Sequence, residues 1–186
     1  MISIDAKEIE KAKLLLHNYP KQVTAAAASA INRTSTAVKT QVSKTIRENY
    51  LISISAKDIK GTLSIKRASS LKLTGMISSI GAAPLITAFR VRTYKKGPVR
   101  VQVLKNSSPK AVPGLFIGTS LKGYVGAMQR KNLSMRYPLR IPRGPSVPQM
   151  FAAKRSMSTI APFAEKTLNQ RFLHEVQYRL GKYGGQ

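Results

Sequence analysis

The chain has 186 residues, which suits one domain, and it carries 32 lysines and arginines against 7 acidic residues, a formal net charge of +25. No acidic residue lies between positions 59 and 164, although 19 basic residues do. This gap argues against hydrolysis by paired carboxylates and against Mg²⁺ or Ca²⁺ sites, and the lack of cysteine excludes zinc ribbons, thiol catalysis and disulfides. We therefore expect no catalytic residue, metal or cofactor, and a surface attracted to nucleic acid or another polyanion.

The N-terminal part of the chain predicts two helices. Residues 6–16 have the spacing of a short helix, and a long second helix is predicted from Pro20 to about Tyr50, because proline is well tolerated at the first helical position. Its inward residues recur at three-to-four spacing and are Val23, Ala27, Ala30, Ile31, Thr34, Val38, Val42, Ile46 and Tyr50. Residues 25–30, Ala-Ala-Ala-Ala-Ser-Ala, give this helix a thin surface that another helix can approach closely, and we interpret them as packing inside the domain.

The middle of the chain changes to a period of two, which is typical of half-buried strands. Apolar residues alternate with polar ones at Leu71, Leu73 and Ile77, at Phe89 and Val91, and at Val99, Val101 and Val103. Residues 95–98, Lys-Lys-Gly-Pro, predict a hairpin turn between the last two strands. A further pair of strands is expected to flank residues 121–123, with Phe116 and Val125 on the strands.

Four prolines within residues 137–148 predict an extended arm or loop, because proline blocks helices and central strands. A helix is expected to resume near Gln149, to break or kink at Pro162, and to end with Gly181 as its C-terminal cap. Its apolar stripe comprises Leu168, Phe172, Val176 and Leu180. Residues 182–186 are predicted to form a flexible tail.

These elements together predict a single α+β domain over residues 1–186. It has a long N-terminal helix, a mainly antiparallel sheet, a proline-rich arm and a C-terminal helix. No apolar run approaches the ~20 residues of a membrane span, so we expect no membrane contact.

Two basic clusters are candidate interaction surfaces. The first lies on the predicted hairpin, with its arginines on the polar face, and comprises Arg90, Arg92, Lys95, Lys96 and Arg100. This cluster is either a surface that binds the phosphate backbone of a nucleic acid or an ordinary solvated face. Because aromatic residues are sparse, any contact with DNA is expected to be to its backbone, without recognition of the bases. The second surrounds the arm and comprises Arg130, Arg136, Arg140 and Arg143. It suits either a contact between subunits or a loop folded over its own sheet.

The histidines do not indicate catalysis. His17 and His174 are the only two, and both fall in or beside predicted helices, where a solvated surface position is the better interpretation. The sequence lacks a Gly-x-Ser-x-Gly elbow and the glycine-rich loops that bind nucleotides.

Two ordered blocks resemble the bacteriophage minor tail protein Z family, the tail completion proteins of long-tailed phages. Residues 26–34, Ala-Ala-Ala-Ser-Ala-Ile-Asn-Arg-Thr, are similar to a block in the family's early long helix. The second block runs from Val112-Pro113-Gly114-Leu115-Phe116-Ile117 through Met128-Gln129-Arg130, Arg136-Tyr137-Pro138 and Ile141-Pro142 to Val147-Pro148. The motif residues to which we assign structural roles are Asn32, Arg33, Pro113, Gly114, Phe116, Tyr137 and Pro138.

Several of these motif residues carry specific expectations. Asn32 and Arg33 are either a helix-surface pair or a buried polar contact that fixes the helix against the sheet. Pro113 and Gly114 are expected to set a turn, and Phe116 to enter the core.

The resemblance implies a structural virion protein with no enzymatic role. Such a minor tail protein would act in tail completion at the head-proximal end of the tail, helping head–tail joining and DNA placement. It would work as a ring oligomer with other tail or neck proteins, assembled in the host cytoplasm. From the residues alone, the alternative is a non-specific nucleic-acid-binding module that acts as a free monomer.

Overall fold

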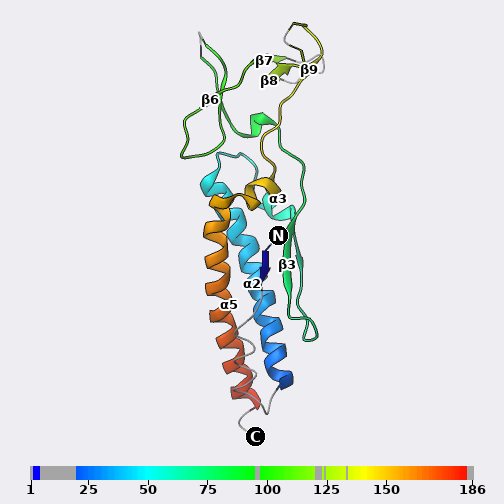
Figure 1. The fold of residues 1–186 in the computed structure, drawn as a ribbon, viewed down its shortest axis with the longest axis vertical. Coiled ribbons are helices and arrows are strands. Elements are labelled where there is room, and N and C mark those ends of the chain that lie inside the picture. The colour runs from blue at the N-terminus through cyan, green and yellow to red at the C-terminus, as the bar shows by residue number, and fades with distance from the viewer. Residues whose placement is uncertain are drawn as a thin grey trace.

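The computed structural model describes residues 2–4, 20–94, 97–119, 123, 125–132 and 134–183. These residues form an elongated molecule, with a stem of two long helices and a head of short strands at one end (Figure 1). The predicted helix over residues 6–16, His17, Lys95 and Lys96 lie outside the described residues.

Helix α2 (Pro20–Asn49) begins at the predicted proline, and every residue of its predicted inward stripe is buried, from Val23 to Tyr50. The helix ends where the chain turns to sheet pairing. The Tyr50 N–H still donates to the Ile46 carbonyl, but the Leu51 N–H donates to the Val103 carbonyl at 2.8 Å. The end of α2 is thereby joined directly to the head.

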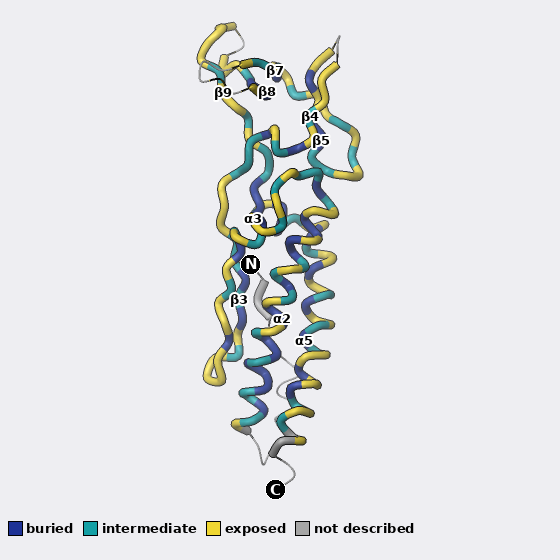
Figure 2. Tube along the Cα trace, turned by 180° about the vertical axis from the view of Figure 1, so that it is seen from behind, coloured by how far each residue is buried: buried dark blue, intermediate teal, exposed yellow. Residues whose placement is uncertain are grey.

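Helix α5 (Lys154–Tyr183) packs along α2 and buries Ile160, Ala164, Leu168 and Phe172 (Figure 1). The thin alanine surface of α2 therefore packs inside the chain, as predicted: Ala26 and Ala27 are fully buried. Figure 2 shows the buried residues as a stripe along the facing sides of the two helices. The stem is thus held by one buried seam that is mainly apolar.

Two predicted limits of α5 are wrong. The predicted break at Pro162 is absent because the helix continues through it, and the chain instead breaks at Ala153, an extended residue (ψ 136) between α4 (Val147–Ala152) and α5. Burial of Ile160 and Ala164, on either side of the proline, holds the helix together despite the lost backbone hydrogen bond. The helix also passes Gly181, which lacks the positive φ of a C-terminal cap. Residues 184–186 of the predicted tail lie outside the described residues.

A small antiparallel sheet lies against the stem in the order β1-β3-β2, formed by β1 (Ile2–Ile4), β3 (Gly75–Ser79) and β2 (Leu63–Lys66) (Figure 1). Helix α3 (Ala56–Gly61) precedes it and is capped by Ser55. The strand predicted through Leu71, Leu73 and Ile77 is confirmed only at Ile77, which lies buried in β3. Residues 69–72 instead form the hairpin turn, where Ser69 and Lys72 exchange backbone hydrogen bonds and leave Leu71 fully exposed.

The head contains two more antiparallel sheets and a short 3-10 helix, η1 (Ile86–Ala88). One sheet has the order β4 (Arg90–Arg92), β5 (Arg100–Gln102), β6 (Lys110–Ala111). The other has the order β7 (Leu115–Thr119), β8 (Val125–Arg130), β9 (Leu139–Arg140). Both predicted hairpins are therefore confirmed, and the α+β class is confirmed with its strands divided among three sheets.

The turn that precedes β7 corrects one core residue. Pro113 and Gly114 form a turn, closed by the Leu115 N–H on the Val112 carbonyl at 3.2 Å, and Gly114 has a φ of +67°, which glycine adopts readily. The turn sets the strand register so that Leu115 is buried and Phe116 only half-buried. Leu115, not Phe116, enters the core here.

The proline-rich arm folds back on its own chain. Leu85 and Arg143 form a β-bridge, the Ile86 N–H donates to the Pro142 carbonyl at 2.9 Å, and the Gly144 N–H donates to the Pro84 carbonyl at 2.9 Å. The arm then enters α4, where Ser146 and Gln149 form a capping box. The arm therefore folds over its own chain.

Candidate functional site

The basic hairpin of β4 and β5 presents its arginines to solvent, as the alternation predicts. Arg92 pairs with Arg100 across the two strands, and Arg90 pairs with Gln102 on the same face. All three arginines are exposed, and the Arg100 guanidinium lies 5.7 Å from the centre of the Tyr94 ring. The other face, carrying Val91 and Val101, packs toward the core.

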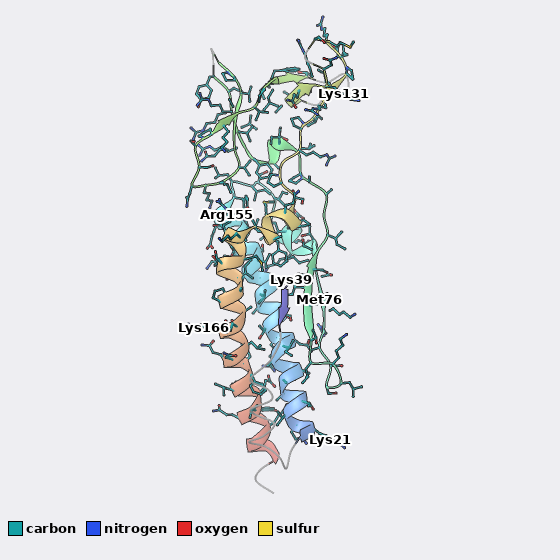
Figure 3. The ribbon with its side chains drawn as sticks, viewed as in Figure 1. Lys21, Lys39, Met76, Lys131, Arg155 and Lys166 are labelled. Atoms are coloured by element: carbon teal, nitrogen blue, oxygen red, sulfur yellow. The ribbon has the colours of Figure 1, made fainter. Side chains whose placement is uncertain are left out.

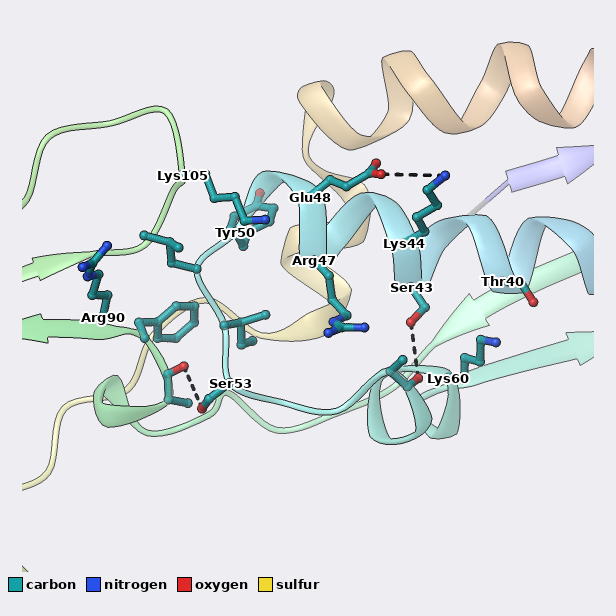
Figure 4. Close-up of a pocket in the computed structure, with 15 residues that line it drawn as sticks. Thr40, Ser43, Lys44, Arg47, Glu48, Tyr50, Ser53, Lys60, Arg90 and Lys105 are labelled. Carbon is teal, nitrogen blue, oxygen red and sulfur yellow. Dashed lines mark hydrogen bonds and ion pairs between the residues drawn. The ribbon is translucent and has the colours of Figure 1, made fainter.

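A pocket of about 690 Å³ lies where this hairpin meets the end of α2 (Figure 4). Residues far apart in the sequence converge on it from α2, α3, the strand-like segment after α2, η1, β4 and the turn after β5. Its lining residues are Thr40, Ser43, Lys44, Arg47, Glu48, Tyr50, Leu51, Ile52, Ser53, Ala56, Lys60, Ala88, Phe89, Arg90 and Lys105.

Hydrogen bonds hold the walls of this junction pocket in place. The Ser43 hydroxyl donates to the Ala56 carbonyl at 3.3 Å and ties α2 to α3. The Ser53 hydroxyl donates to the Ala88 carbonyl at 3.1 Å and ties the segment after α2 to η1. The pocket is therefore built on fixed backbone elements.

The charge of the junction pocket is strongly unbalanced. Five cations line it: Lys44, Arg47, Lys60, Arg90 and Lys105. Glu48 is the only carboxylate among the lining residues, and it lies 3.9 Å from Lys44. Within the part of the chain that the structure describes, no acceptor contacts the side chains of the other four cations.

Sequence reasoning missed most of this pocket. Arg90 was a candidate through the hairpin, but Lys60 and Lys105 join it only through the fold. The spacing of Lys44 and Arg47 on the outer face of α2 is the one local signal that could have indicated it.

The second basic cluster divides into two kinds of residue. Arg140 donates through Nε and Nη2 to the Gln129 Oε1 at 3.1 and 2.8 Å, and Arg143 donates to the Ala83 carbonyl at 2.7 Å. Arg130 and Arg136 are exposed, and the Arg136 guanidinium lies 6.0 Å from the Tyr137 ring centre. Two of the four arginines are thus occupied in holding the head together.

The second motif block forms a connected structural unit. The Gln129 amide donates to the Pro113 carbonyl at 2.7 Å while its Oε1 accepts from Arg140, so one side chain joins the turn, β8 and β9. Tyr137 and Pro138 are exposed, and the Pro138 carbonyl accepts from the Lys131 N–H at 3.0 Å. This block positions the far end of the head.

Asn32 and Arg33 of the first block fix α2 on both sides. Asn32 exchanges two hydrogen bonds with the backbone of Ala68, at 3.0 and 2.8 Å, which confirms the contact between helix and sheet segment. Arg33 forms a 3.0 Å ion pair with Glu175 of α5. The pair therefore anchors the helix to two different neighbours.

The described residues offer no support for a catalytic or metal centre. His174 is exposed, which confirms its surface position. Among the described residues, no three histidine, cysteine or acidic side chains gather where they could hold a metal ion. None of the helices in the described ranges has the length and apolar character required to cross a bilayer.

Comparison with known proteins identifies the family. The family described as prophage minor tail protein Z (GPZ) matches residues 7–184, a range that includes both motif blocks. No curated protein and no solved structure matches the chain. The chain therefore belongs to the minor tail protein Z family and is a structural protein of the phage tail.

Proposed function

We propose that this tail protein is a tail completion subunit at the head-proximal end of the tail, where it helps head–tail joining and DNA placement without enzymatic activity. The observation that carries the proposal is the exposed basic hairpin at one end of an elongated molecule, with Arg90, Arg92 and Arg100 facing solvent. Charge of this kind meets DNA through its backbone, without sequence recognition.

The subunit works in a ring with other tail or neck proteins. Arg130 and Arg136 are the members of the arm cluster that are best suited to contact a neighbour, because no acceptor within the described residues contacts either side chain. Arg140 and Arg143 support that surface from inside the subunit. The long stem leaves the head free to meet its neighbours.

The test replaces the five hairpin cations, Arg90, Arg92, Lys95, Lys96 and Arg100, by glutamine in particles assembled with the variant. We expect tails of normal length but reduced infectivity and reduced DNA retention. The matched control replaces five stem cations, Lys21, Lys39, Lys154, Lys166 and Arg171. Unchanged infectivity and DNA retention in the hairpin variant would contradict the role in DNA placement.

The alternative function, a free nucleic-acid-binding module, makes a different prediction. Such a module would remain monomeric and bind DNA with an affinity that falls steeply with salt. The tail subunit should instead form rings or bind tail tubes, which negative-stain electron microscopy of the purified protein distinguishes.

A further inference from the structure

We infer that the junction pocket is a phosphate-binding subsite for a nucleic-acid backbone, formed by Arg47, Lys60, Arg90 and Lys105. The inference rests on the proposed function, because it assigns a ligand to the base of the same basic hairpin. It adds three cations that the hairpin itself does not contain. Figure 4 shows their side chains around the pocket, on elements that the core holds in place.

The first support is the absence of internal partners for these cations. Like charges that line one pocket repel one another, and an anion that binds between them relieves the repulsion. Here the one lining carboxylate, Glu48, is engaged at 3.9 Å by Lys44. The remaining four cations attract an anion from outside, and each of the two guanidinium groups can pair with two oxygens of a phosphate.

The second support is the continuity of the charge. Arg90 lines the pocket and also starts the row that Arg92 and Arg100 continue along the exposed face of the hairpin. A nucleic-acid backbone carries its charges in a regular row, so it can contact the pocket and the hairpin together. A single small anion would need only the pocket.

The pocket floor favours this ligand over an acidic peptide. A peptide gains specificity from apolar or aromatic anchors that enter fully desolvated pockets. The two aromatic residues of the floor are already used by the core, since Tyr50 is 6% and Phe89 4% exposed. These two rings therefore offer little aromatic surface to a peptide anchor, whereas the cationic side chains that line the pocket are accessible.

The experiment measures binding of a fluorescein-labelled 20-base-pair DNA duplex and of one of its strands to the full-length chain across a salt series. The pocket variant is R47Q/K60Q/K105Q, which leaves the hairpin arginines intact. The matched control, K21Q/K166Q/R171Q, removes the same charge from exposed stem positions. Figure 3 shows Lys21 and Lys166 on the stem away from the head, and Arg171 lies on α5 beyond Lys166. Thermal unfolding of each variant verifies that it folds.

The pocket variant should bind both probes at least about tenfold more weakly near 0.1 M salt, and its duplex salt slope should fall by about 2.7, or about 0.9 for each lost phosphate contact. The control should lose less than about one unit of slope. A weakening of duplex binding alone would assign the subsite to duplex DNA, and of single-strand binding alone to an unpaired end. Equal losses in the pocket and control variants would overturn the inference.

Two further measurements do not depend on removing cations. Glu48→Gln frees Lys44 and removes the only lining carboxylate, so it should tighten DNA binding by about two- to fivefold. In the unaltered protein, DNA should slow acetylation of Lys60 and Lys105 but not of Lys166. Unchanged affinity in E48Q with no protection of these lysines would refute the subsite.

A poly-L-glutamate probe tests the rival ligand. If its affinity fell in the pocket variant while DNA binding matched the control, the pocket would bind an acidic protein segment and the nucleic-acid assignment would be wrong. Because these assays use purified protein, their failure leaves the proposed role in the tail untouched, and the particle assay tests that role separately.

Discussion

Arg33 of α2 and Glu175 of α5 form a 3.0 Å ion pair in which the glutamate side chain is only 5% exposed while the arginine is 57% exposed. A nearly buried carboxylate in the helix seam thus depends on a cation that solvent still reaches. Arg179, near Glu175 on α5, also bridges the helices by donating to the Ser29 hydroxyl at 3.2 Å. Polar contacts therefore join α2 and α5 across a seam that is mainly apolar.

We predict an asymmetry between the two partners of this ion pair. Arg33→Met should lower the free energy of unfolding by about 1–3 kcal/mol, because it leaves the carboxylate buried without a cation. Glu175→Gln should cost less, since its amide oxygen can still accept from Arg33 and the arginine can be solvated. Urea denaturation measures both.

The exposed pair Lys44–Glu48 supplies the control for that comparison. Lys44→Gln should change the free energy of unfolding by less than about 0.5 kcal/mol, as is usual for surface ion pairs. If Arg33→Met and Lys44→Gln lowered the free energy of unfolding by the same small amount, the buried Glu175 carboxylate would not depend on Arg33 for stability.

Asn32→Ala should detach the β2–β3 hairpin locally from α2. The substitution removes both hydrogen bonds to Ala68, a residue that is 7% exposed, and leaves its backbone groups unpaired. We expect a loss of about 1–3 kcal/mol in unfolding free energy and faster hydrogen exchange of the Ala68 amide. Thr36→Ala, whose hydroxyl bonds only within its own exposed helix turn, should leave that exchange rate unchanged.

Gly75→Ala should separate β3 from α2, because a Cβ at this position would lie 2.6 Å from Ile31 Cγ2 and 3.0 Å from Ser35 Oγ. We expect a loss of about 1–3 kcal/mol in unfolding free energy. Gly61→Ala provides the control, since its Cβ would meet nothing within 4 Å. A similar Tm for the two alanine variants would show that the close approach is not needed.

Pro162→Ala should stabilise the protein. Pro162 is exposed inside α5, and proline is about 3 kcal/mol less favourable than alanine in a helix interior. Alanine restores the backbone N–H without removing a core contact, so Tm should rise by several degrees in differential scanning calorimetry. A lower Tm would mean that the helix has adapted to the proline.

The elements predicted best from the sequence are those whose residues lie within a single helix or a single hairpin. The inward stripe of α2 from Val23 to Tyr50 and the β4–β5 alternation follow directly from local periodicity. The break predicted at Pro162 is wrong because packing of Ile160 and Ala164 outweighs the local propensity of proline in α5. Nothing in the structure explains why the helix passes the exposed Gly181. The prediction that Phe116 enters the core is wrong because alternation along a strand does not say which of its two faces is buried. The turn at Gly114 sets the register that buries Leu115 instead.

Only those residues of the candidate site that lie on a single hairpin could be predicted from the sequence. Arg90, Arg92 and Arg100 are adjacent through a local pairing, so their shared face was visible in the sequence. Lys60 and Lys105 reach the junction pocket through α3 and the turn after β5, and no short-range pattern links them. The partner of Arg33 was equally hidden, since helix pairing alone brings Glu175 beside it.

The most direct test of the central claim is the position of this protein in the particle. An epitope tag at the C-terminus, followed by immunogold electron microscopy of isolated tails and whole phages, would locate it. We expect gold at the tail end that meets the head, on tails and whole particles alike. Gold at the opposite tip, or none on any particle despite a detectable tag in the lysate, would contradict a tail completion role.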